Sequence, residues 1–383
     1  MAESLIGAAR PTVAEIDLEA VRHNIGELRR ASSTDVCAVV KADGYGHGAV
    51  PVAVAALEAG AAWLAVALVE EGVALRSAGI TAPVLVLSEP HPAAAPLVVA
   101  NDLRPTLYTA AGIAAMAAAA GGAPAPIRSP ATPLAVHVKV DTGMHRVGAQ
   151  PEAVVDLVRQ VEHSPSLRFE GLWTHLATAD EADPAFTDEQ LRRFEAVRAS
   201  LAEAGFRPGL VHASNSAGAL HHPDARYDLV RCGIAIYGCA PAPGRPIDAD
   251  LRPVMSLRSK VSLVKRVAAG EAVSYGQRHR FDRDTIVATV PIGYADGVPR
   301  RLSAVGGEVL IGGRRRLIAG TITMDQILVA CDEDGSVAIG DDVVLLGRQG
   351  HEVITADDWA RPLDTISYEI VCGISGRVPR VYR

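Results

Sequence analysis

Short apolar runs alternate with alanine-rich segments of helical period through the first two thirds of the chain. Eight runs have the length and composition of buried strands: "VCAVVK", "AWLAVAL", "PVLVL", "RPTLY", "LAVHVKV", "FEGLWTH", "LVHAS" and "YDLVR". This alternation is typical of βα units that build a parallel sheet. Eight units within about 230 residues predict a (β/α)8 barrel.

After residue 248 the pattern changes to β-branched, alternating segments broken by Gly and Asp, such as "TIVATVPIGYADG" and "GDDVVLLG". Such segments indicate antiparallel strands. Near the start, "PTVAEID" predicts another strand and "LEAVRHNIGELRR" a helix. We therefore expect an α/β protein with a (β/α)8 TIM-type barrel over residues 1–248. A mainly antiparallel β domain should follow over residues 249–383, and residues 1–11 could pair with it.

The amino-acid composition and charge exclude several classes of function. Of 383 residues 49% are hydrophobic, which is ample for a large core, and the net charge of −7 provides no basic surface for nucleic acid. No segment reaches the roughly 20 uncharged apolar residues of a membrane span, and the first residues lack a signal-peptide pattern. The five cysteines are scattered without a CxxC pair, so neither disulfides nor a metal site is expected. We expect a cytoplasmic protein with small-molecule partners.

Lys41 ends the first barrel strand and is followed by "ADGYGHGA". The glycine spacing fits a dinucleotide-binding loop, with Glu70 as a candidate ribose-binding acid, but that fingerprint requires no lysine at this place. In a barrel the carboxyl ends of the strands form the active site, so Lys41 would lie at the reaction centre. A solvated lysine at a strand end is the alternative.

Polar and ionisable residues recur at the same end of later strands: His137, Lys139, Asp141, Arg146, His175 and Ser216. Lys139 lies between apolar neighbours and should point inward, where it needs an ion pair with Asp141 or a chemical modification. Ser216 and the amides of Gly233 and Ile234 lie where barrels commonly bind phosphate, although Ser216 could be a turn residue. A lysine opposite a phosphate site suggests pyridoxal 5'-phosphate, bound as a Schiff base.

The segment "AVVKADGYGHG" resembles the cofactor-lysine motif of alanine racemases, a barrel class of pyridoxal phosphate enzymes. The resemblance spans nearly the whole chain, since "KVDTGMHRVG", "EGLWTHLATADE", "SNSAG", "VRCGIAIYG", "VSYGQ", "IGYADG", "TMDQ" and "YEIVCGISGRVPR" follow in the family's order. It implies an isomerase that interconverts L-alanine and D-alanine and supplies D-alanine for peptidoglycan.

The resemblance implies that Lys41 holds the cofactor and is one racemisation base, and that Tyr275 is the other. Tyr294, Met324, Asp325 and Tyr275 reach the active site of the other subunit in this family, so a homodimer is implied. The implied cofactor-binding residues are Lys41, Tyr45, Arg146, His175, Asn215, Ser216, Arg231, Gly233, Ile234 and Tyr368, with Arg231 facing the pyridine nitrogen. The implied substrate-binding residues are Arg146, Tyr294, Met324 and Asp325, and Lys139 matches a lysine that some members carry as a carbamate.

Two positions depart from the family pattern. His145 stands where a small residue is more usual, and Thr323 where many members have cysteine. Both bear on substrate preference, for which serine or a broad range of amino acids is the alternative to alanine. A barrel-type decarboxylase resembles the chain less, because it would place an acid at the ring nitrogen and not Arg231. A non-catalytic cofactor carrier should lack the β domain. Without the resemblance, Tyr275 would be assigned to cross-strand packing.

Overall fold

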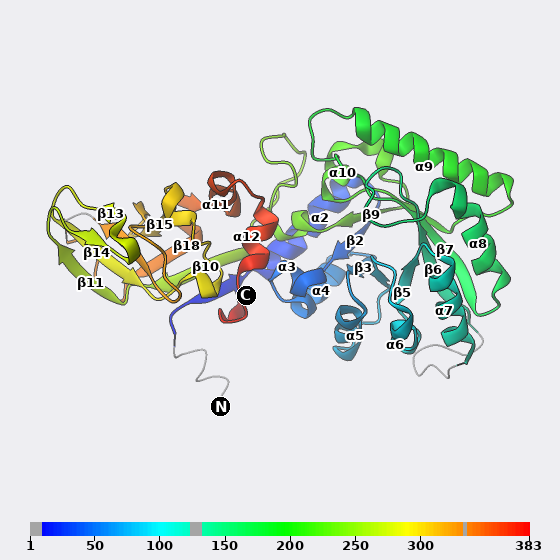
Figure 1. Cartoon of the computed structure of the whole chain (residues 1–383), viewed down its shortest axis with the longest axis horizontal. Helices are drawn as coiled ribbons and strands as arrows, with labels where there is room; N and C mark the ends of the chain where they lie inside the picture. The colour runs from blue at the N-terminus through cyan, green and yellow to red at the C-terminus, as the bar shows by residue number, and fades with distance from the viewer. Residues whose placement is uncertain (1–9, 123–131, 332–334) are drawn as a thin grey trace. The chain divides into compact units, whose positions relative to one another are not determined.

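The computed structural model describes residues 10–122, 132–331 and 335–383. The chain folds into two compact units (Figure 1). The barrel unit comprises residues 21–44 and 49–252, and the β unit combines residues 253–383 with 45–48 and with the described residues up to 20. The domain boundary expected at residue 248 remains a prediction.

All eight predicted barrel strands are present. They are β2 (Asp35–Val39), β3 (Trp63–Val66), β4 (Val84–Val86), β5 (Arg104–Leu107), β6 (Leu134–Lys139), β7 (Leu167–Trp173), β8 (Leu210–His212) and β9 (Leu229–Cys232). Their order in the sheet is β8-β7-β6-β5-β4-β3-β2-β9, and every pairing is parallel. Amide hydrogen bonds from Asp228 to Val211 and from Arg231 to Ser214 join β9 to β8. The sheet thereby closes into the expected barrel.

Burial explains why these runs form strands. All six residues of β6 are buried, as are the last four of β2, because barrel strands are covered on both faces. The connecting helices cover the outside of the sheet (Figure 1). In α8, Val154, Leu157, Val158 and Val161 are buried, which is the i, i+3, i+4, i+7 stripe of an amphipathic helix. The helices of this unit are α2 (Leu18–Ser32), α3 (Lys41–Tyr45), α4 (Ala49–Glu58), α5 (Val69–Ser77), α6 (Ala95–Ala100), α7 (Ala110–Gly122), α8 (Val154–His163), α9 (Ala185–Glu203) and α10 (Ser216–His221).

The β unit is built mainly from antiparallel strands, as predicted. Its main sheet has the order β16-β15-β18-β10-β1-β20, with β19 paired to β18, and smaller sheets join β11-β14-β17 and β12-β13. The strands are β1 (Val13–Ile16), β10 (Met255–Lys260), β11 (Leu263–Val267), β12 (Ala272–Val273), β13 (His279–Arg280), β14 (Thr285–Val290), β15 (Glu308–Ile311), β16 (Arg314–Leu317), β17 (Ile327–Cys331), β18 (Asp342–Gln349), β19 (Glu352–Ile354) and β20 (Arg380–Tyr382). The fold class predicted from the sequence is therefore confirmed.

The early strand and two late helices complete this unit. β1 pairs antiparallel with β10 and parallel with β20, so residues from both chain ends share one sheet. The sequence pattern did not predict α11 (Ala356–Leu363) and α12 (Ser367–Gly373). Most of the proline-rich linker expected before β6 lies outside the described residues. No helix in the described ranges is long and apolar enough to cross a membrane.

Candidate functional site

Lys41 follows β2 directly and begins a left-handed turn. Ala42, Asp43, Gly44 and Tyr45 have φ angles of +52°, +50°, +61° and +52°. Each non-glycine residue in this region costs roughly 1–2 kcal/mol, so other contacts must hold the turn. The turn fixes the backbone immediately after the lysine at the carboxyl end of a barrel strand.

Two carboxylates hold this turn. Asp43 accepts a hydrogen bond from the amide of Ala49 at 2.8 Å. Glu71, on α5, accepts from the amide of Ala42 at 2.6 Å and also from the amides of Ala67 and Leu68 at 2.8 and 3.0 Å. The sequence offered the neighbouring Glu70 as a candidate acid and gave no signal for Glu71, because nothing in it shows that α5 begins beside the lysine turn.

Lys139 and Arg231 share an aromatic platform. The Lys139 Nζ lies 4.6 Å from the Trp173 ring centroid, and the Arg231 guanidinium carbon lies 4.5 Å from it. Burial and the charges of Arg231 and Arg146 lower the pKa of Lys139 to about 7, with a smaller contribution from Lys41. The lysines and arginines predicted for this site therefore lie close enough to repel one another, and the expected Lys139–Asp141 pair does not neutralise them.

Arg231 is buried and bonded mainly to neutral acceptors. Its Nη2 donates to the carbonyls of Thr174 and Ala213 at 2.9 and 2.8 Å and approaches His175 Nδ1 at 3.2 Å, while Nη1 donates to His212 Nδ1 at 2.8 Å. Within the described part of the chain, Nε makes no hydrogen bond and no carboxylate forms an ion pair with the guanidinium. A buried cation without a direct counter-charge, and with donors left over on Nε and Nη1, is typical of a ligand-binding arginine.

The contact with Arg231 bears on the protonation state of His175. Burial and the charge of Arg231 hold the pKa of His175 well below its usual value, so the imidazole is neutral. Because an arginine nitrogen offers only donors, the 3.2 Å contact favours His175 Nδ1 as an acceptor that shares an Nη2 hydrogen, with the imidazole proton on Nε2.

The predicted phosphate residues form a compact group after β8 and β9. The buried hydroxyl of Ser216 accepts hydrogen bonds from the amides of Gly233 and Ala235 at 3.0 and 3.4 Å. Asn215 caps α10 by accepting from the amide of Gly218 at 2.9 Å, which is a structural role. The structure thus brings Ser216 and Gly233 together, next to Ile234.

The loop after β6 carries Arg146, which is exposed, and the unusual His145. Asp141 accepts from the amides of Gly143 and His145 at 3.0 Å each, and these bonds overcome burial to lower its pKa. The His145 side chain is 73% exposed and lies 3.4 Å from Asp141, so it shapes this loop and does not enter the barrel core.

In the β unit, Tyr45 and Tyr368 pack together. Their ring centroids lie 6.2 Å apart, and burial raises the pKa of Tyr45 above its ordinary range. Gly46 permits close approach of this segment to α12, since a Cβ there would lie 2.6 Å from the carbonyl oxygen of Val371. Both predicted phosphate-binding tyrosines therefore occupy one site within this unit.

Tyr275 lies in a strained turn and is not a packed cross-strand residue, because it is 72% exposed. Ser274, before it, has φ +63°. The Thr321 hydroxyl donates to the Tyr275 carbonyl at 2.9 Å, and the Ser274 hydroxyl donates to the Thr321 carbonyl at 2.5 Å. These bonds fix the backbone while the phenol projects outward.

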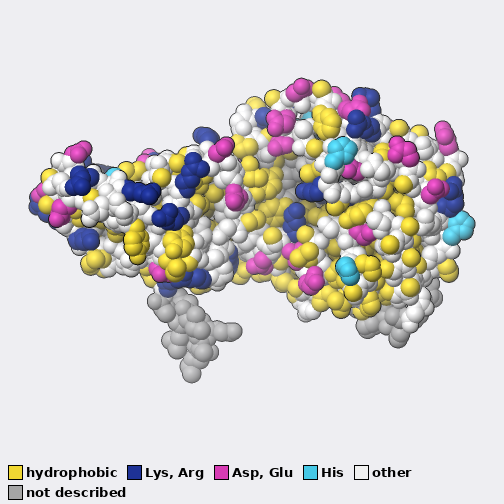
Figure 2. Space-filling view, viewed as in Figure 1, with side chains coloured by type: hydrophobic (Ala, Val, Ile, Leu, Met, Phe, Trp, Pro, Cys, Tyr) yellow, Lys and Arg dark blue, Asp and Glu magenta, His cyan; other side chains and the backbone are white. Residues whose placement is uncertain are grey.

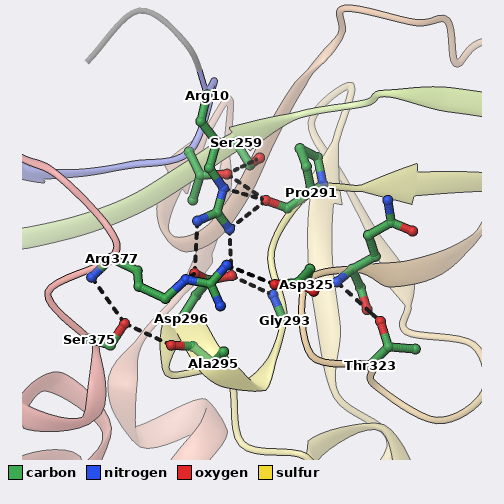
Figure 3. Close-up of polar contacts among 12 residues, drawn as sticks. Arg10, Ser259, Pro291, Gly293, Ala295, Asp296, Thr323, Asp325, Ser375 and Arg377 are labelled. Carbon is green, nitrogen blue, oxygen red and sulfur yellow. Dashed lines mark hydrogen bonds and ion pairs between the residues drawn. The ribbon is translucent and has the colours of Figure 1, made fainter. Parts of the chain in front are cut away.

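A second network holds three of the predicted substrate residues, Tyr294, Met324 and Asp325, of which Figure 3 shows Asp325 with its partner Arg377. The amides of Tyr294 and Ala295 donate to the carbonyls of Thr323 and Met324 at 3.0 and 3.1 Å. Asp325 accepts from Arg377 at 2.7 Å. The side chains of Tyr294 and Met324 are 41% and 52% exposed. Thr323, the second departure, turns its hydroxyl to the carbonyl of Gln326 at 2.8 Å.

A basic cavity adjoins the Tyr275 turn. It has a volume of about 580 Å³ and is lined by Arg278, His279, Arg300, Arg301, Ser303, Ala304, Gly320 and Thr321. Basic side chains also gather on the face of the β unit drawn in Figure 2. Among the described residues that line the cavity, Arg278, Arg300 and Arg301 are cationic and none carries a carboxylate, which suits an anionic small molecule.

Comparison with known proteins identifies this arrangement. Residues 16–241 match the model of the alanine racemase N-terminal domain, and residues 254–382 that of the C-terminal domain. An alanine racemase of Symbiobacterium thermophilum is 52% identical, with 97% of each chain covered.

Solved structures agree. The alanine racemase of Bacillus anthracis with bound L-Ala-P superimposes with a TM-score of 0.90 at 38% identity, covering 98% of this chain and 95% of that one. A histidine racemase of Leuconostoc mesenteroides gives 0.89 at 29% identity, covering 98% of each chain. The resemblance inferred from the motifs is confirmed, and with it the prediction of a racemase enzyme: the chain belongs to the alanine racemase family.

Proposed function

We propose that this protein is a pyridoxal phosphate-dependent alanine racemase that interconverts L-alanine and D-alanine. The observation that carries the proposal is the buried Arg231, which has no direct carboxylate partner in the described part of the chain. It lies with Lys139 on Trp173, and the charge of Lys41 acts on Lys139. Family membership and the L-Ala-P bound to the Bacillus anthracis relative support alanine as the substrate.

The residues present fit this cofactor. The free Nε–H of Arg231 suits the ring nitrogen, which is an acceptor. The Ser216 hydroxyl and the amides of Gly233 and Ile234 would hold the phosphate, with Tyr45 and Tyr368, and Lys41 would hold the cofactor covalently. When bound, the cofactor spreads the negative charge that remains when the α-proton of an amino acid leaves.

Racemisation needs proton exchange on both faces of the α-carbon, and two residues are assigned to it. The Lys41 amine would accept or deliver the proton on one face, and the Tyr275 phenol on the other. A phenol has an ordinary pKa near ~10 and needs help to act as a base. His175 could provide it, since its Nε2–H is available while Arg231 binds Nδ1.

Lys139 is chemically suited to carbamylation. Its pKa of about 7 leaves much of the amine neutral near pH 7, and only a neutral amine adds CO2, with release of one proton. The resulting anion would offset the charges of Arg231 and Arg146.

The exposed Tyr275, Tyr294 and Met324 support a homodimer in which each subunit contributes to the other's site. Tyr294 and Tyr368 would narrow the pocket and favour alanine. Serine and a broader range remain alternatives, as the histidine racemase likeness illustrates. Cytoplasmic supply of D-alanine for peptidoglycan is part of this proposal.

The test is to incubate the cofactor-loaded enzyme with L-alanine in D2O and to follow circular dichroism together with the α-proton NMR signal. Loss of optical activity with deuterium at Cα is expected. Lys41→Ala should abolish cofactor absorption and activity in both directions. Tyr275→Phe should keep the cofactor and chiefly slow proton abstraction from L-alanine. Full activity of that variant from both enantiomers would disprove the two-base assignment.

A further inference from the structure

A chain of hydrogen bonds runs from Arg231 through the interior of the barrel to a distant carboxylate. Arg231 Nη1 lies 2.8 Å from His212 Nδ1, His212 Nε2 lies 3.0 Å from His137 Nδ1, and His137 Nε2 lies 3.2 Å from Glu170. Both histidines are completely buried. None of the roles assigned above uses His137, His212 or Glu170.

The arginine fixes the direction of every bond in this chain. A guanidinium can only donate, so His212 Nδ1 accepts and His212 Nε2 carries the proton. That proton is donated to His137 Nδ1, so His137 Nε2 carries the next proton and donates it to Glu170. Burial lowers the pKa of both imidazoles, which keeps them neutral. The chain therefore has a cation at one end, an anion at the other, and two aligned imidazole dipoles between them.

The surrounding residues are arranged to keep this geometry. A side chain at position 171 would collide with His137, because a Cβ there would lie 2.4 Å from its Nδ1. Trp173 stacks on His212 at 5.5 Å between centroids, and Trp63 packs edge-on against His137 at 5.4 Å. With both rings held in place, neither imidazole can turn to exchange its donor and acceptor nitrogens.

Glu170 is held ionised at the far end. Arg104 Nε lies 3.3 Å from its carboxylate and Arg168 donates to it at 2.9 Å. Burial opposes ionisation, but the hydrogen bond from His137 and the charge of Arg104 prevail and lower the pKa of Glu170 to about 2. The carboxylate is thus a permanent negative terminus.

We propose that Glu170 is a positioning residue that orients Arg231 and stabilises its charge through His137 and His212. The inference rests on the proposed function, in which Arg231 faces the cofactor ring. The relay anchors Nη1 and supplies a remote counter-charge, so Nε–H stays directed at the ring nitrogen without a competing carboxylate beside it.

The first measurement is the tautomeric state of His137 and His212 in the full-length holoenzyme. Long-range 1H–15N NMR of histidine-labelled protein reports it, and the spectrum of His137→Gln assigns the signals. We expect neutral Nε2–H forms for both rings that do not titrate between about pH 6 and pH 9. A proton on Nδ1 of either ring would overturn the relay. This readout is independent of racemisation, so an inactive enzyme would refute the proposed function while the relay is still decided.

The second measurement compares Glu170→Gln with the matched change Glu162→Gln. Glu162 is an exposed carboxylate on α8 that accepts from the amide of Phe169, the residue before Glu170 in β7. In Glu170→Gln the His212 Nε2–H resonance should move upfield, and kcat should fall about tenfold with little change in KM. Glu162→Gln should change neither. Equal resonances and equal kcat in the two variants would overturn the proposal, and should Glu170→Gln fail to fold, the wild-type tautomers still decide it.

Discussion

Asp296→Asn is the substitution for which the structure gives the clearest estimate of lost stability. The Asp296 side chain is fully buried and accepts a bidentate pair of hydrogen bonds from Arg10 at 2.8 and 2.5 Å, and a third from the Gly293 amide at 2.9 Å (Figure 3). Asparagine has the same shape but one acceptor oxygen. In either orientation its amide NH2 would therefore face a donor of Arg10, and in one orientation it would also face the Gly293 amide.

The expected loss of stability follows from how deeply Asp296 and Arg10 are buried. Removing one partner of a buried ion pair costs about 3–5 kcal/mol, but the Arg10 side chain is 25% exposed and can be partly rehydrated, so we expect about 2–3 kcal/mol. Burial by itself would raise the pKa of Asp296, yet hydrogen bonds from Arg10 and Gly293 prevail and lower it. A carboxylate with a lowered folded-state pKa stabilises fully above its unfolded value near ~3.9 and loses that contribution as pH falls. The difference between wild type and variant should shrink below about pH 4.

The assay is urea unfolding of both proteins at one protein and cofactor concentration, because binding and subunit contacts alter apparent stability. Asp342→Asn is the matched control: its partner Lys260 is bonded at 2.6 Å, but both side chains are about half or more exposed. We expect that control to cost less than about 1 kcal/mol. Equal midpoints for the two variants at neutral pH would refute the reasoning from burial.

Three further substitutions or treatments test the remaining features. Gly297→Ala should lower the free energy of unfolding by about 3 kcal/mol or more in a denaturant titration, since φ is +108° and a Cβ would lie 2.3 Å from a backbone oxygen. The control Gly205→Ala, at φ +88° with open space around it, should lower it by about 1 kcal/mol. Glu71→Ala should weaken cofactor binding, measured by absorbance titration, because three amides lose their acceptor; unchanged affinity would contradict its role. In 13C NMR with 13C-bicarbonate at about pH 8, the wild-type protein should give a carbamate carbon signal that is absent from Lys139→Ala. A signal that persists in the variant would exclude Lys139 as the site of carbamylation.

The barrel and the lysine turn were predictable because their signals are local. Each barrel strand is a short apolar run bounded by turn residues, and the position of Lys41 at a strand end follows from the run before it. Helices α11 and α12 were missed because each is short and follows a region of alternating strands.

The partners that hold the site could not be predicted because each lies far away in sequence. Glu71 reaches Ala42 across 29 positions, and Arg377 reaches Asp325 across 52. Glu170 appears in the sequence as one polar residue in a strand, and only the closed barrel places it at the end of a chain from Arg231. Contacts between side chains that are distant in sequence depend on strand register, which the amino-acid composition does not determine.

Buried charges are compensated in two different ways in this protein, and the difference bears on catalysis. Asp296 binds Arg10 directly, which neutralises the pair and suits a residue that only holds a loop. Among the described residues Arg231 has no direct carboxylate partner, and its hydrogen bonds lead through two neutral imidazoles to the carboxylate of Glu170. A carboxylate in contact with Arg231 would occupy its donors and cancel its field at the cofactor ring. In the proposed relay, a remote carboxylate would reduce the cost of burying the cation, and the positive charge and Nε–H of Arg231 would remain available to the proposed cofactor.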